Sequence, residues 1–367
     1  MVEWKKLGEV CEVLNGFAFK SSEYVPKGIR IIRISDVQNG YISDKDKVFY
    51  PIEKLSEFER YLLNNGDLVM SLTGNPGRVA FIRNESCALN QRVACLRAKT
   101  VSNSYLFYLF NCKEFESTAF ANSTGGAQKN LSTTWLNNFL IPIPSLEEQT
   151  RIVGILDTFT SAIDNLKEQI AQRRKQYEYY RDQLLDLEGK PGVEMKTLGE
   201  VCKLERGVRV VKKDLQEQGA IPVFQNSLTP LGFYEKSNYP EHTTFVICAG
   251  AAGEVGYSEI AFWAADDCTC IICPSSICSK YVYNYLMVKQ HLLKAQVRKA
   301  SVPRLSKDVI GKLQLPLPSL QEQQRIVSIL DTFEASIQNL EQQLAQREKQ
   351  YEYYRNRLLS FEEAARG

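Results

Sequence analysis

The chain has 367 residues, of which 44% are hydrophobic and 24% are charged, and its formal net charge is +2. This length and composition allow more than one hydrophobic core. No apolar run approaches the roughly 18 residues that a membrane-spanning helix needs, and the N-terminal segment lacks the apolar stretch of a signal peptide. We therefore expect a soluble, cytoplasmic protein whose 10 cysteines are reduced thiols. The small net charge argues against a uniformly basic nucleic-acid binder, although local basic faces remain possible.

The first 144 residues predict an α+β domain. Short β-branched runs at 28–34, 67–72 and 92–96 are bounded by turn residues, which favours strands, and residues 104–115 favour a helix. Arginines and lysines recur through this region. They indicate either a basic face or ordinary surface charge, and the sequence alone leaves both interpretations open.

Residues 145–188 predict a long helix. Ser145 precedes Glu148 by three positions, which is the spacing of a capping box at a helix start. Apolar or aromatic residues then recur at steps of three and four, as in a coiled coil. The segment 152–187 would be about 54 Å long at about 1.5 Å per residue, so it must pack against something equally long. Arg173 interrupts this seam, where it would set the register or meet an acidic partner.

Residues 189–318 predict a second α+β domain, which opens with residues 194–202 as a copy of residues 3–11. Strands are expected at 221–225, 244–249 and 269–273, and a helix near 280–296. This domain also holds a cluster of cysteines. They lack the paired spacing of a zinc site, and their surroundings favour a buried strand, so metal binding is the weaker interpretation. The cluster comprises Cys268, Cys270, Cys273 and Cys278.

Residues 319–367 predict a second long helix. The segment 144–188 returns as 318–362 with 30 identical residues in 45 positions, and Arg347 takes the place of Arg173. Matching seams in one chain allow the two helices to pair, and connectivity makes the pair antiparallel, with pseudo-twofold symmetry that brings the N-terminus beside the end of the second helix. The predicted seam includes Leu156, Phe159, Ile163, Leu166, Tyr177 and Tyr180 in the first copy, and Leu330, Phe333, Ile337, Leu340, Tyr351 and Tyr354 in the second.

Few residues suit catalysis. The two histidines, His242 and His291, have no expected partner nearby, and no phosphate-binding loop of the Walker type is present. The glycine-rich segment 250–256 follows a strand-like run without the rest of a dinucleotide-binding unit, which favours a tight turn. Residues 3–5 and 194–196 match a nuclease motif by three letters only. The sequence therefore indicates no catalytic residues and no metal site in this chain.

The duplicated framework resembles the DNA specificity (S) subunit of type I restriction-modification enzymes over essentially the whole chain. The resemblance rests on LGEVCEVLNGFAFKSSEY, GDLVMSLTGNPGRVAFI and LNQRVACL in the first half, and on GVRVVKKDL, IPVFQNS, GAAGEVGY and FWAADDC in the second. The strings IPIPSLEEQTRIVGILD and LPLPSLQEQQRIVSILD resemble the family's junctions between a target recognition domain and a spacer helix.

The resemblance implies target recognition domains at 1–144 and 189–318, joined by spacer helices at 145–188 and 319–367. Each domain would recognise one half of a bipartite, asymmetric site in double-stranded DNA, and the helices would set the length of the unread gap. The chain would hold no cofactor and carry out no catalysis. It would assemble with two modification subunits, which bind S-adenosylmethionine and methylate adenine, and with restriction subunits, which use ATP and magnesium.

Base recognition requires forked donors and amides, and phosphate contact requires cations. On that chemistry the DNA-binding candidates are Arg78, Asn90, Gln91, Arg92, Gln128 and Lys129 in the first domain, and Arg206, Arg209, Lys212, Lys213, Gln225 and Asn226 in the second. Each has a structural alternative, because Asn90 and Asn226 could cap turns and Arg92 could pair with an acid. Tyr179 and Tyr353 lie off the seam and are candidates for contact with modification subunits.

Two other functions remain open at this point. A coiled-coil adaptor that binds no DNA would explain the helices, but it gives no reason for two divergent domains. A self-sufficient nuclease or methyltransferase would need an S-adenosylmethionine or metal site, which the sequence does not indicate.

Overall fold

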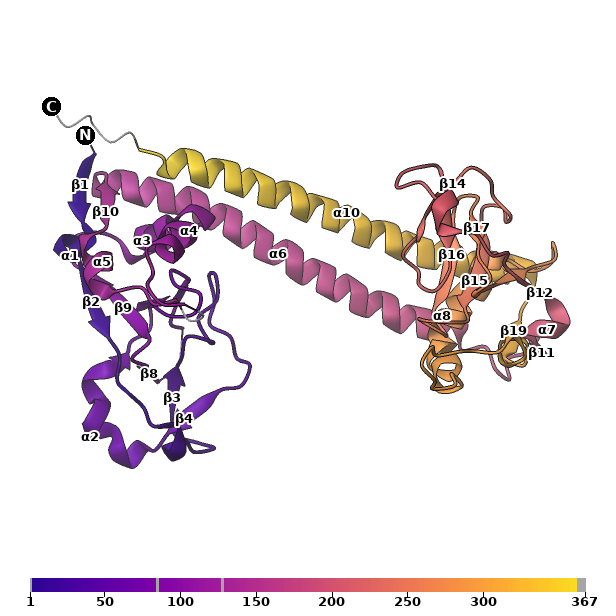
Figure 1. The fold of residues 1–367 in the computed structure, drawn as a ribbon, viewed down its shortest axis with the longest axis horizontal. Helices are drawn as coiled ribbons and strands as arrows, with labels where there is room; N and C mark the ends of the chain where they lie inside the picture. Colours follow the sequence, from indigo (N-terminus) through magenta and orange to yellow (C-terminus); the bar gives the residue numbers. More distant parts are fainter. Residues whose placement is uncertain (1, 84–85, 127–128, 362–367) are drawn as a thin grey trace. The chain divides into compact units, whose positions relative to one another are not determined.

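The computed structural model describes residues 2–83, 86–126 and 129–361, and it divides into two compact units. Unit 1 comprises Met1–Asn165 and Leu344–Gly367, and unit 2 comprises Leu166–Gln343. Two 40-residue helices, α6 (Leu146–Leu185) and α10 (Leu320–Leu359), contribute to both units (Figure 1). No helix in the described part of the chain is long and apolar enough to cross a membrane. The predicted domain boundaries after residues 144, 188 and 318 stay a prediction.

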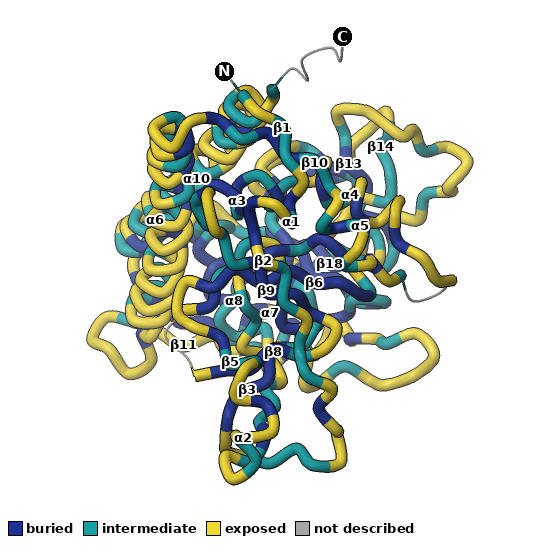
Figure 2. The backbone as a smooth tube through the Cα atoms, turned by 90° about the vertical axis from the view of Figure 1, so that its left-hand side faces the viewer, coloured by how far each residue is buried: buried dark blue, intermediate teal, exposed yellow. Residues whose placement is uncertain are grey.

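Unit 1 is built on mainly antiparallel strands whose buried positions form its core. In Figure 2 several of these strands are largely dark blue, whereas the long helices are mostly exposed. The strands are β1 (Glu3–Lys6), β2 (Cys11–Asn15), β3 (Ile29–Ile32), β4 (Val48–Tyr50), β5 (Leu62–Leu63), β6 (Leu68–Ser71), β7 (Val79–Phe81), β8 (Cys87–Leu89), β9 (Val93–Ala98) and β10 (Leu140–Ile143). They form sheets in the orders β2-β9-β6-β7, β4-β3-β8-β5 and β1-β10, with β3 and β8 parallel. The strands predicted at 28–34, 67–72 and 92–96 are confirmed as β3, β6 and β9.

The helices of unit 1 correct one prediction. They are α1 (Leu7–Val10), α2 (Leu55–Phe58), α3 (Asn103–Phe110), α4 (Lys113–Ala121) and α5 (Thr133–Asn138), besides the parts of α6 and α10. The single helix predicted at 104–115 is wrong, because α3 ends at Phe110 and a new helix starts at Lys113. The Cys112 thiol accepts the Phe115 amide at 3.4 Å as an N-cap, and the rings of Phe110 and Phe115 pack 4.5 Å apart across the break.

Unit 2 repeats two sheets of unit 1 and has a three-stranded sheet where unit 1 has its second four-stranded one. Its elements are β11 (Glu194–Thr197), α7 (Leu198–Val201), β12 (Lys203–Arg206), β13 (Ile221–Phe224), β14 (Gly232–Tyr234), β15 (Thr243–Ile247), β16 (Val255–Ser258), β17 (Trp263–Ala264), β18 (Cys268–Ile272), α8 (Ser279–Ala295), α9 (Lys307–Gly311) and β19 (Gln314–Leu317). The sheet β12-β18-β15-β16 has the same antiparallel order as β2-β9-β6-β7, and the pair β11-β19 corresponds to β1-β10. The predicted strands and the helix near 280–296 are confirmed.

The two long helices begin where the sequence predicts. The Ser145 hydroxyl accepts the Glu148 amide at 3.2 Å, and Ser319 and Glu322 make the same bond at 3.3 Å. The reciprocal half of the predicted capping box does not form, because each glutamate instead binds the arginine three residues further on through two charge-assisted hydrogen bonds of 2.6–2.7 Å. Those bonds hold the pKa of both carboxyl groups below its usual range.

The apolar pattern predicts seams that end at Leu187 and Phe361, but helices α6 and α10 end two residues earlier. Leu187 and Phe361 lie beyond α6 and α10, respectively. Leu187 is buried in the core of unit 2, and Phe361 packs in a cluster of unit 1 with Tyr351 and Leu358. The end of α10 and strand β1 lie at the same end of unit 1 (Figure 1), as predicted for the N-terminus. Gly367, however, lies outside the described residues.

The pairing of α6 with α10 is antiparallel, as predicted. In unit 1 the ring of Phe159 stacks on Tyr354 with the centroids 5.3 Å apart, and in unit 2 Phe333 stacks on Tyr180 at 5.4 Å. Phe159 and Phe333 are equivalent in the repeat, and so are Tyr180 and Tyr354, so each phenylalanine stacks on the tyrosine of the other helix. Arg347 lies 5.8 Å from the Phe159 ring and Arg173 lies 6.0 Å from the Phe333 ring. The seam arginines therefore meet aromatic faces rather than an acidic partner, and a cation–π contact explains why the same residue recurs.

The seam also serves the domains. Leu156 is fully buried in a cluster with Tyr105 and Tyr108 of helix α3, and Leu330 is fully buried in the core of unit 2 with Tyr281 of helix α8. The apolar stripe near the start of α6 is therefore buried against helix α3 as well as against α10. The stripe near the start of α10 is buried against helix α8 as well as against α6. This arrangement fixes each domain to the start of one long helix.

Candidate nucleic-acid interface

A buried glutamine anchors each domain to a long helix. Gln149 is 1% exposed; its side-chain carbonyl accepts the Ser102 amide at 3.0 Å, and its side-chain amide donates to the Pro144 carbonyl at 2.9 Å. Gln323 is 2% exposed and makes the equivalent bonds to the Cys278 amide at 2.9 Å and to the preceding proline carbonyl at 3.0 Å. Ser102 and Cys278 are the N-caps of α3 and α8. Each glutamine therefore ties a domain helix to the start of a spacer helix.

A buried tyrosine makes a second repeated anchor. The Tyr105 hydroxyl donates to the Pro142 carbonyl at 2.9 Å, and the Tyr281 hydroxyl donates to the Pro316 carbonyl at 2.8 Å. Burial raises the pKa of both phenols, so both remain protonated donors at neutral pH. These anchors hold the sheets of each unit in the same relation to its own long helix.

In unit 1, three loops meet at one end of the sheet β2-β9-β6-β7. The Leu72 amide donates to the Arg92 carbonyl at 3.0 Å, and the Leu131 amide donates to the Leu72 carbonyl at 2.7 Å. The Gly74 amide donates to the Lys129 carbonyl at 2.9 Å. We call this arrangement loop cluster 1; it comprises residues 72–78, 89–93 and the described residues of 122–131.

Unit 2 builds the same cluster from different residues. The Cys248 amide donates to the Asp267 carbonyl at 2.6 Å, and the Leu305 amide donates to the Cys248 carbonyl at 2.8 Å. The Gly250 amide donates to the Pro303 carbonyl at 3.2 Å. We call this arrangement loop cluster 2; it comprises residues 248–254, 264–268 and 296–305. These three backbone bonds correspond one to one with the three given for loop cluster 1.

A glycine lets the chain cross each cluster closely. An added Cβ on Gly16 would lie 2.3 Å from the backbone of Asn90, and one on Gly207 would lie 2.2 Å from the Ala265 carbonyl oxygen. The residues that follow them, Phe17 and Val208, then donate their amides to the facing turn at 2.8 and 2.9 Å. No side chain fits in that space, so glycine is required at both equivalent positions.

Loop cluster 1 collects part of the predicted site. Gln91 and Arg92 are exposed and line a pocket of about 350 Å³ together with Thr73, Asn130 and Leu72. The Asn90 side chain instead accepts the Arg92 amide at 3.2 Å, so Asn90 caps its own turn, which is the structural alternative noted above.

Three further candidates of unit 1 have other positions. Arg78 donates to Glu116 at 3.3 Å and to Gln38 at 3.0 Å, so its guanidinium is engaged within the unit. The Lys129 ammonium lies 5.3 Å from the Phe120 ring. Gln128 lies outside the described residues.

Three of the six candidates in unit 2 contact residues of loop cluster 2. Arg206 donates to the Asp266 carbonyl at 2.5 Å, the Gln225 carbonyl accepts the Cys268 thiol at 3.2 Å, and the Asn226 carbonyl accepts the Ala251 amide at 2.9 Å. The other three, Arg209, Lys212 and Lys213, are exposed in and before the short 3-10 turn Lys212–Asp214. That all these residues contact DNA stays a prediction.

The sequence reasoning missed five residues of the clusters. Thr73 and Thr124 form bridges with Asn130 in loop cluster 1, and Arg298 forms a bridge with Arg304 in loop cluster 2. A signal was available, because similarity between the halves resumes at Asn130-Leu131-Ser132 and Arg304-Leu305-Ser306. The leucine and serine of the two triplets are the same, whereas the first residue is asparagine in one half and arginine in the other.

The tyrosines proposed for partner contact are exposed. The exposed fractions of Tyr179 and Tyr353 are 61% and 59%, and each ring packs edge-on against the next tyrosine, Tyr180 or Tyr354. The two pairs occupy equivalent places on α6 and α10. A docking role for Tyr179 and Tyr353 stays a prediction.

The cysteine cluster is mainly structural. Cys268 and Cys270 are fully buried in β18, and burial raises the pKa of both thiols. Cys273 follows the strand, and its sulfur lies 3.6 Å from that of Cys202. Among the residues that the structure describes, no group of three or more histidine, cysteine or acidic side chains could hold a metal ion.

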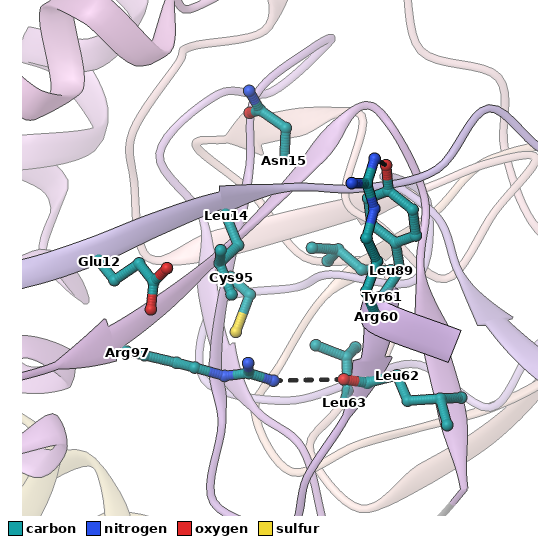
Figure 3. Close-up of a pocket in the computed structure, with 10 residues that line it drawn as sticks. All are labelled: Glu12, Leu14, Asn15, Arg60, Tyr61, Leu62, Leu63, Leu89, Cys95 and Arg97. Carbon is teal, nitrogen blue, oxygen red and sulfur yellow. Dashed lines mark hydrogen bonds between the residues drawn. The ribbon is translucent and has the colours of Figure 1, made fainter. Parts of the chain in front are cut away.

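A separate pocket of about 340 Å³ opens beside strands β2 and β9 of unit 1 (Figure 3). Arg97 lies along it and donates to the Leu62 carbonyl at 3.2 Å and to Asp67 at 2.9 Å. Both bonds hold the guanidinium within the unit, and burial raises the pKa of the lining thiol of Cys95. The pocket therefore offers neither a free cation at Arg97 nor a thiolate at Cys95.

The family of the type I restriction modification DNA specificity domain matches residues 1–173 and 191–349 of this chain. The chain belongs to that family. It is 27% identical, over 98% of its length and 96% of the relative, to a putative type I restriction enzyme specificity subunit of Haemophilus influenzae. It is 31% identical, over 76% of its length and 75% of the relative, to a type I restriction enzyme specificity subunit of Escherichia coli.

Solved structures agree on the fold. The crystal structure of a type I restriction-modification S subunit from M. genitalium matches with a TM-score of 0.68 at 17% identity, covering 99% of this chain and 97% of that one. A chain from a study of complex assembly in the type I system matches with a TM-score of 0.61 at 20% identity, covering 98% and 96%. The family resemblance inferred from the sequence and the predicted fold class, two α+β domains with two long paired helices, are thereby confirmed.

Proposed function

We propose that this chain gives a type I restriction-modification complex its DNA sequence specificity, with each unit recognising one half of a bipartite site in double-stranded DNA. The observation that carries the proposal is the pair of loop clusters. They share their backbone hydrogen bonds but differ in the side chains they present. A common framework with different exposed donors and acceptors suits recognition of two different base sequences.

The duplicated helices suit identical partners. Because α6 and α10 carry the same exposed tyrosine pair, two copies of one modification subunit can dock on equivalent surfaces. We propose that Tyr179 and Tyr353 contact those subunits. The chain itself would hold no cofactor and catalyse no reaction; S-adenosylmethionine belongs to the modification subunits, and ATP and magnesium belong to the restriction subunits. A cytoplasmic location is part of the same proposal.

Methylation mapping tests the proposal directly. Adenine methylation is mapped across genomic DNA in cells that express this chain with its modification subunit, and in cells that lack only this chain. We expect a two-part motif that disappears with the chain. Unchanged methylation, or methylation without a two-part motif, would contradict the proposal.

The coiled-coil adaptor is the alternative that needs a separate measurement. The assembled complex, with and without this chain, is titrated with duplex DNA at several salt concentrations. A recognition subunit should add salt-dependent affinity, because cations that contact phosphates release counterions. An adaptor would leave the DNA affinity of the complex unchanged.

A further inference from the structure

The bridge between Arg298 and Arg304 in loop cluster 2 places two arginines directly opposite each other. The Arg298 amide donates to the Arg304 carbonyl at 2.9 Å, and the Arg304 amide donates to the Arg298 carbonyl at 3.2 Å. Residues that exchange both hydrogen bonds in an antiparallel bridge have Cα atoms about 5.5 Å apart and side chains on the same face. Both arginines are exposed. The two guanidinium groups therefore project from the same face of the bridge.

No acidic group of the unit neutralises this pair. Among the described residues neither guanidinium takes part in an ion pair or a side-chain hydrogen bond, although Asp266 and Asp267 belong to the same loop cluster. Like charges directly opposite each other in a bridge destabilise the fold. An arrangement that costs stability and has no internal partner is suited to an external anion or to a strong acceptor.

The equivalent bridge of unit 1 has different chemistry on the same backbone. Thr124 and Asn130 exchange both backbone hydrogen bonds at 2.9 and 2.8 Å, and the Thr73 hydroxyl lies 3.2 Å from the Asn130 side-chain oxygen. Ala249 replaces Thr73 beside Arg304, so that tether is absent in unit 2. Unit 1 therefore presents a positioned amide where unit 2 presents two forked cations.

This difference separates base contact from phosphate contact. Phosphates are the same in every half-site, so a pair of residues that binds only phosphate has no reason to change between two copies of one framework. Base edges do change. Arginine pairs with the O6 and N7 acceptors of guanine in the major groove, whereas asparagine pairs with adenine.

We propose that Arg298 and Arg304 determine specificity in unit 2 by recognising a guanine in the half-site bound by that unit. The inference rests on the proposed function, and it adds the base and the residues. Arg304 occupies the centre of the bridge, between Ala249 and Arg298, and supplies the fork; Arg298 supports it from the facing strand. The half-site of unit 1 lacks this contact.

The test uses the complete complex of this chain with its modification subunits. Arg298→Gln, Arg304→Gln and the double variant are compared with wild type by methylation of a randomised DNA library. We expect the variants to lose about 10- to 100-fold in methylation of the wild-type motif. The loss should come from one position of one half-site, where guanine gives way to other bases, while the other half-site keeps its sequence.

Two matched controls sharpen the result. Lys299→Gln removes one charge from the same exposed segment and should leave the motif unchanged. Asn130→Ser changes the equivalent bridge and should relax only the other half-site. Circular dichroism and thermal melting of each purified complex establish that the variants are folded.

Two outcomes overturn the inference. A uniform loss on all DNA sequences, with the motif intact and a shallower salt dependence, would make the arginines phosphate contacts. An effect of Lys299→Gln equal to that of Arg304→Gln would make them a source of charge only. In both cases the wild-type complex still yields a two-part motif, so the proposed function survives; if the wild-type complex yields none, the proposed function itself fails.

Discussion

Replacing Gln323 with methionine should detach the start of helix α8 from helix α10. Methionine has a similar length and helix propensity, but it leaves the Cys278 amide and the Pro318 carbonyl without their partners at 2.9 and 3.0 Å. An unsatisfied buried backbone group costs about 1–3 kcal/mol, so two cost about 2–6 kcal/mol. Apolar transfer of the new side chain offsets about 1 kcal/mol of this. The expected net loss is about 1–5 kcal/mol, concentrated in unit 2.

Urea unfolding and hydrogen exchange measure this effect. Gln321→Met makes the same change two residues earlier on the exposed face of α10, so it is the matched control. We expect Gln323→Met to lower the unfolding midpoint and to speed exchange in peptides that contain Cys278, and Gln321→Met to do neither. Equal behaviour of the two variants would refute the anchoring role. Gln149→Met should produce the corresponding losses in unit 1.

Three further outcomes are expected. Gly16→Ala should lower the melting temperature strongly, because the added Cβ would lie 2.3 Å from the backbone of Asn90. Gly154→Ala in helix α6 is its control: the added Cβ would meet no neighbouring atom within 4 Å, and alanine should raise stability by about 1 kcal/mol through its higher helix propensity. Phe333→Leu should cost about 1–2 kcal/mol in urea unfolding, because it removes a ring stack and a cation–π contact; an unchanged midpoint would contradict the seam geometry. Diamide should join Cys202 and Cys273, whose sulfurs are 3.6 Å apart, and mass spectrometry should find that disulfide in wild type but not in Cys202→Ser.

The long helices could be predicted from sequence because their capping residues and apolar spacing are local patterns that occur in both copies of the repeat. Ser145 and Ser319 mark both starts, and the apolar steps mark the faces that become buried. The fate of the seam arginines was not predictable in the same way. Arg173 meets Phe333, which lies on a helix 160 residues later in the chain, and only the antiparallel register brings the two together.

The domains were harder to predict because their contacts connect distant residues. Apolar residues run from Tyr105 to Phe110 and resume at Phe115, and the segment 111–114 between them holds no proline or glycine, so nothing in the sequence marks the break that Cys112 caps. Strand order depends on pairings between segments separated by tens of residues, such as β2 with β9. Arg304 was not among the predicted DNA-binding residues, because its bridge is a single residue long and leaves no strand pattern in the sequence.

The two loop clusters carry their charged residues at different places. In loop cluster 1 the turn after β8 ends in Arg92 and the bridge is neutral; in loop cluster 2 the equivalent turn carries Asp266 and Asp267 and the bridge carries both arginines. The positive charge therefore lies in the turn of loop cluster 1 but in the bridge of loop cluster 2, although equivalent backbone hydrogen bonds hold both clusters. Packing cannot favour such an exchange, since all these side chains lie at least partly in solvent. Under the proposed function, selection for a different bound DNA sequence favours it, because moving a cation relative to a fixed backbone moves the base it would reach.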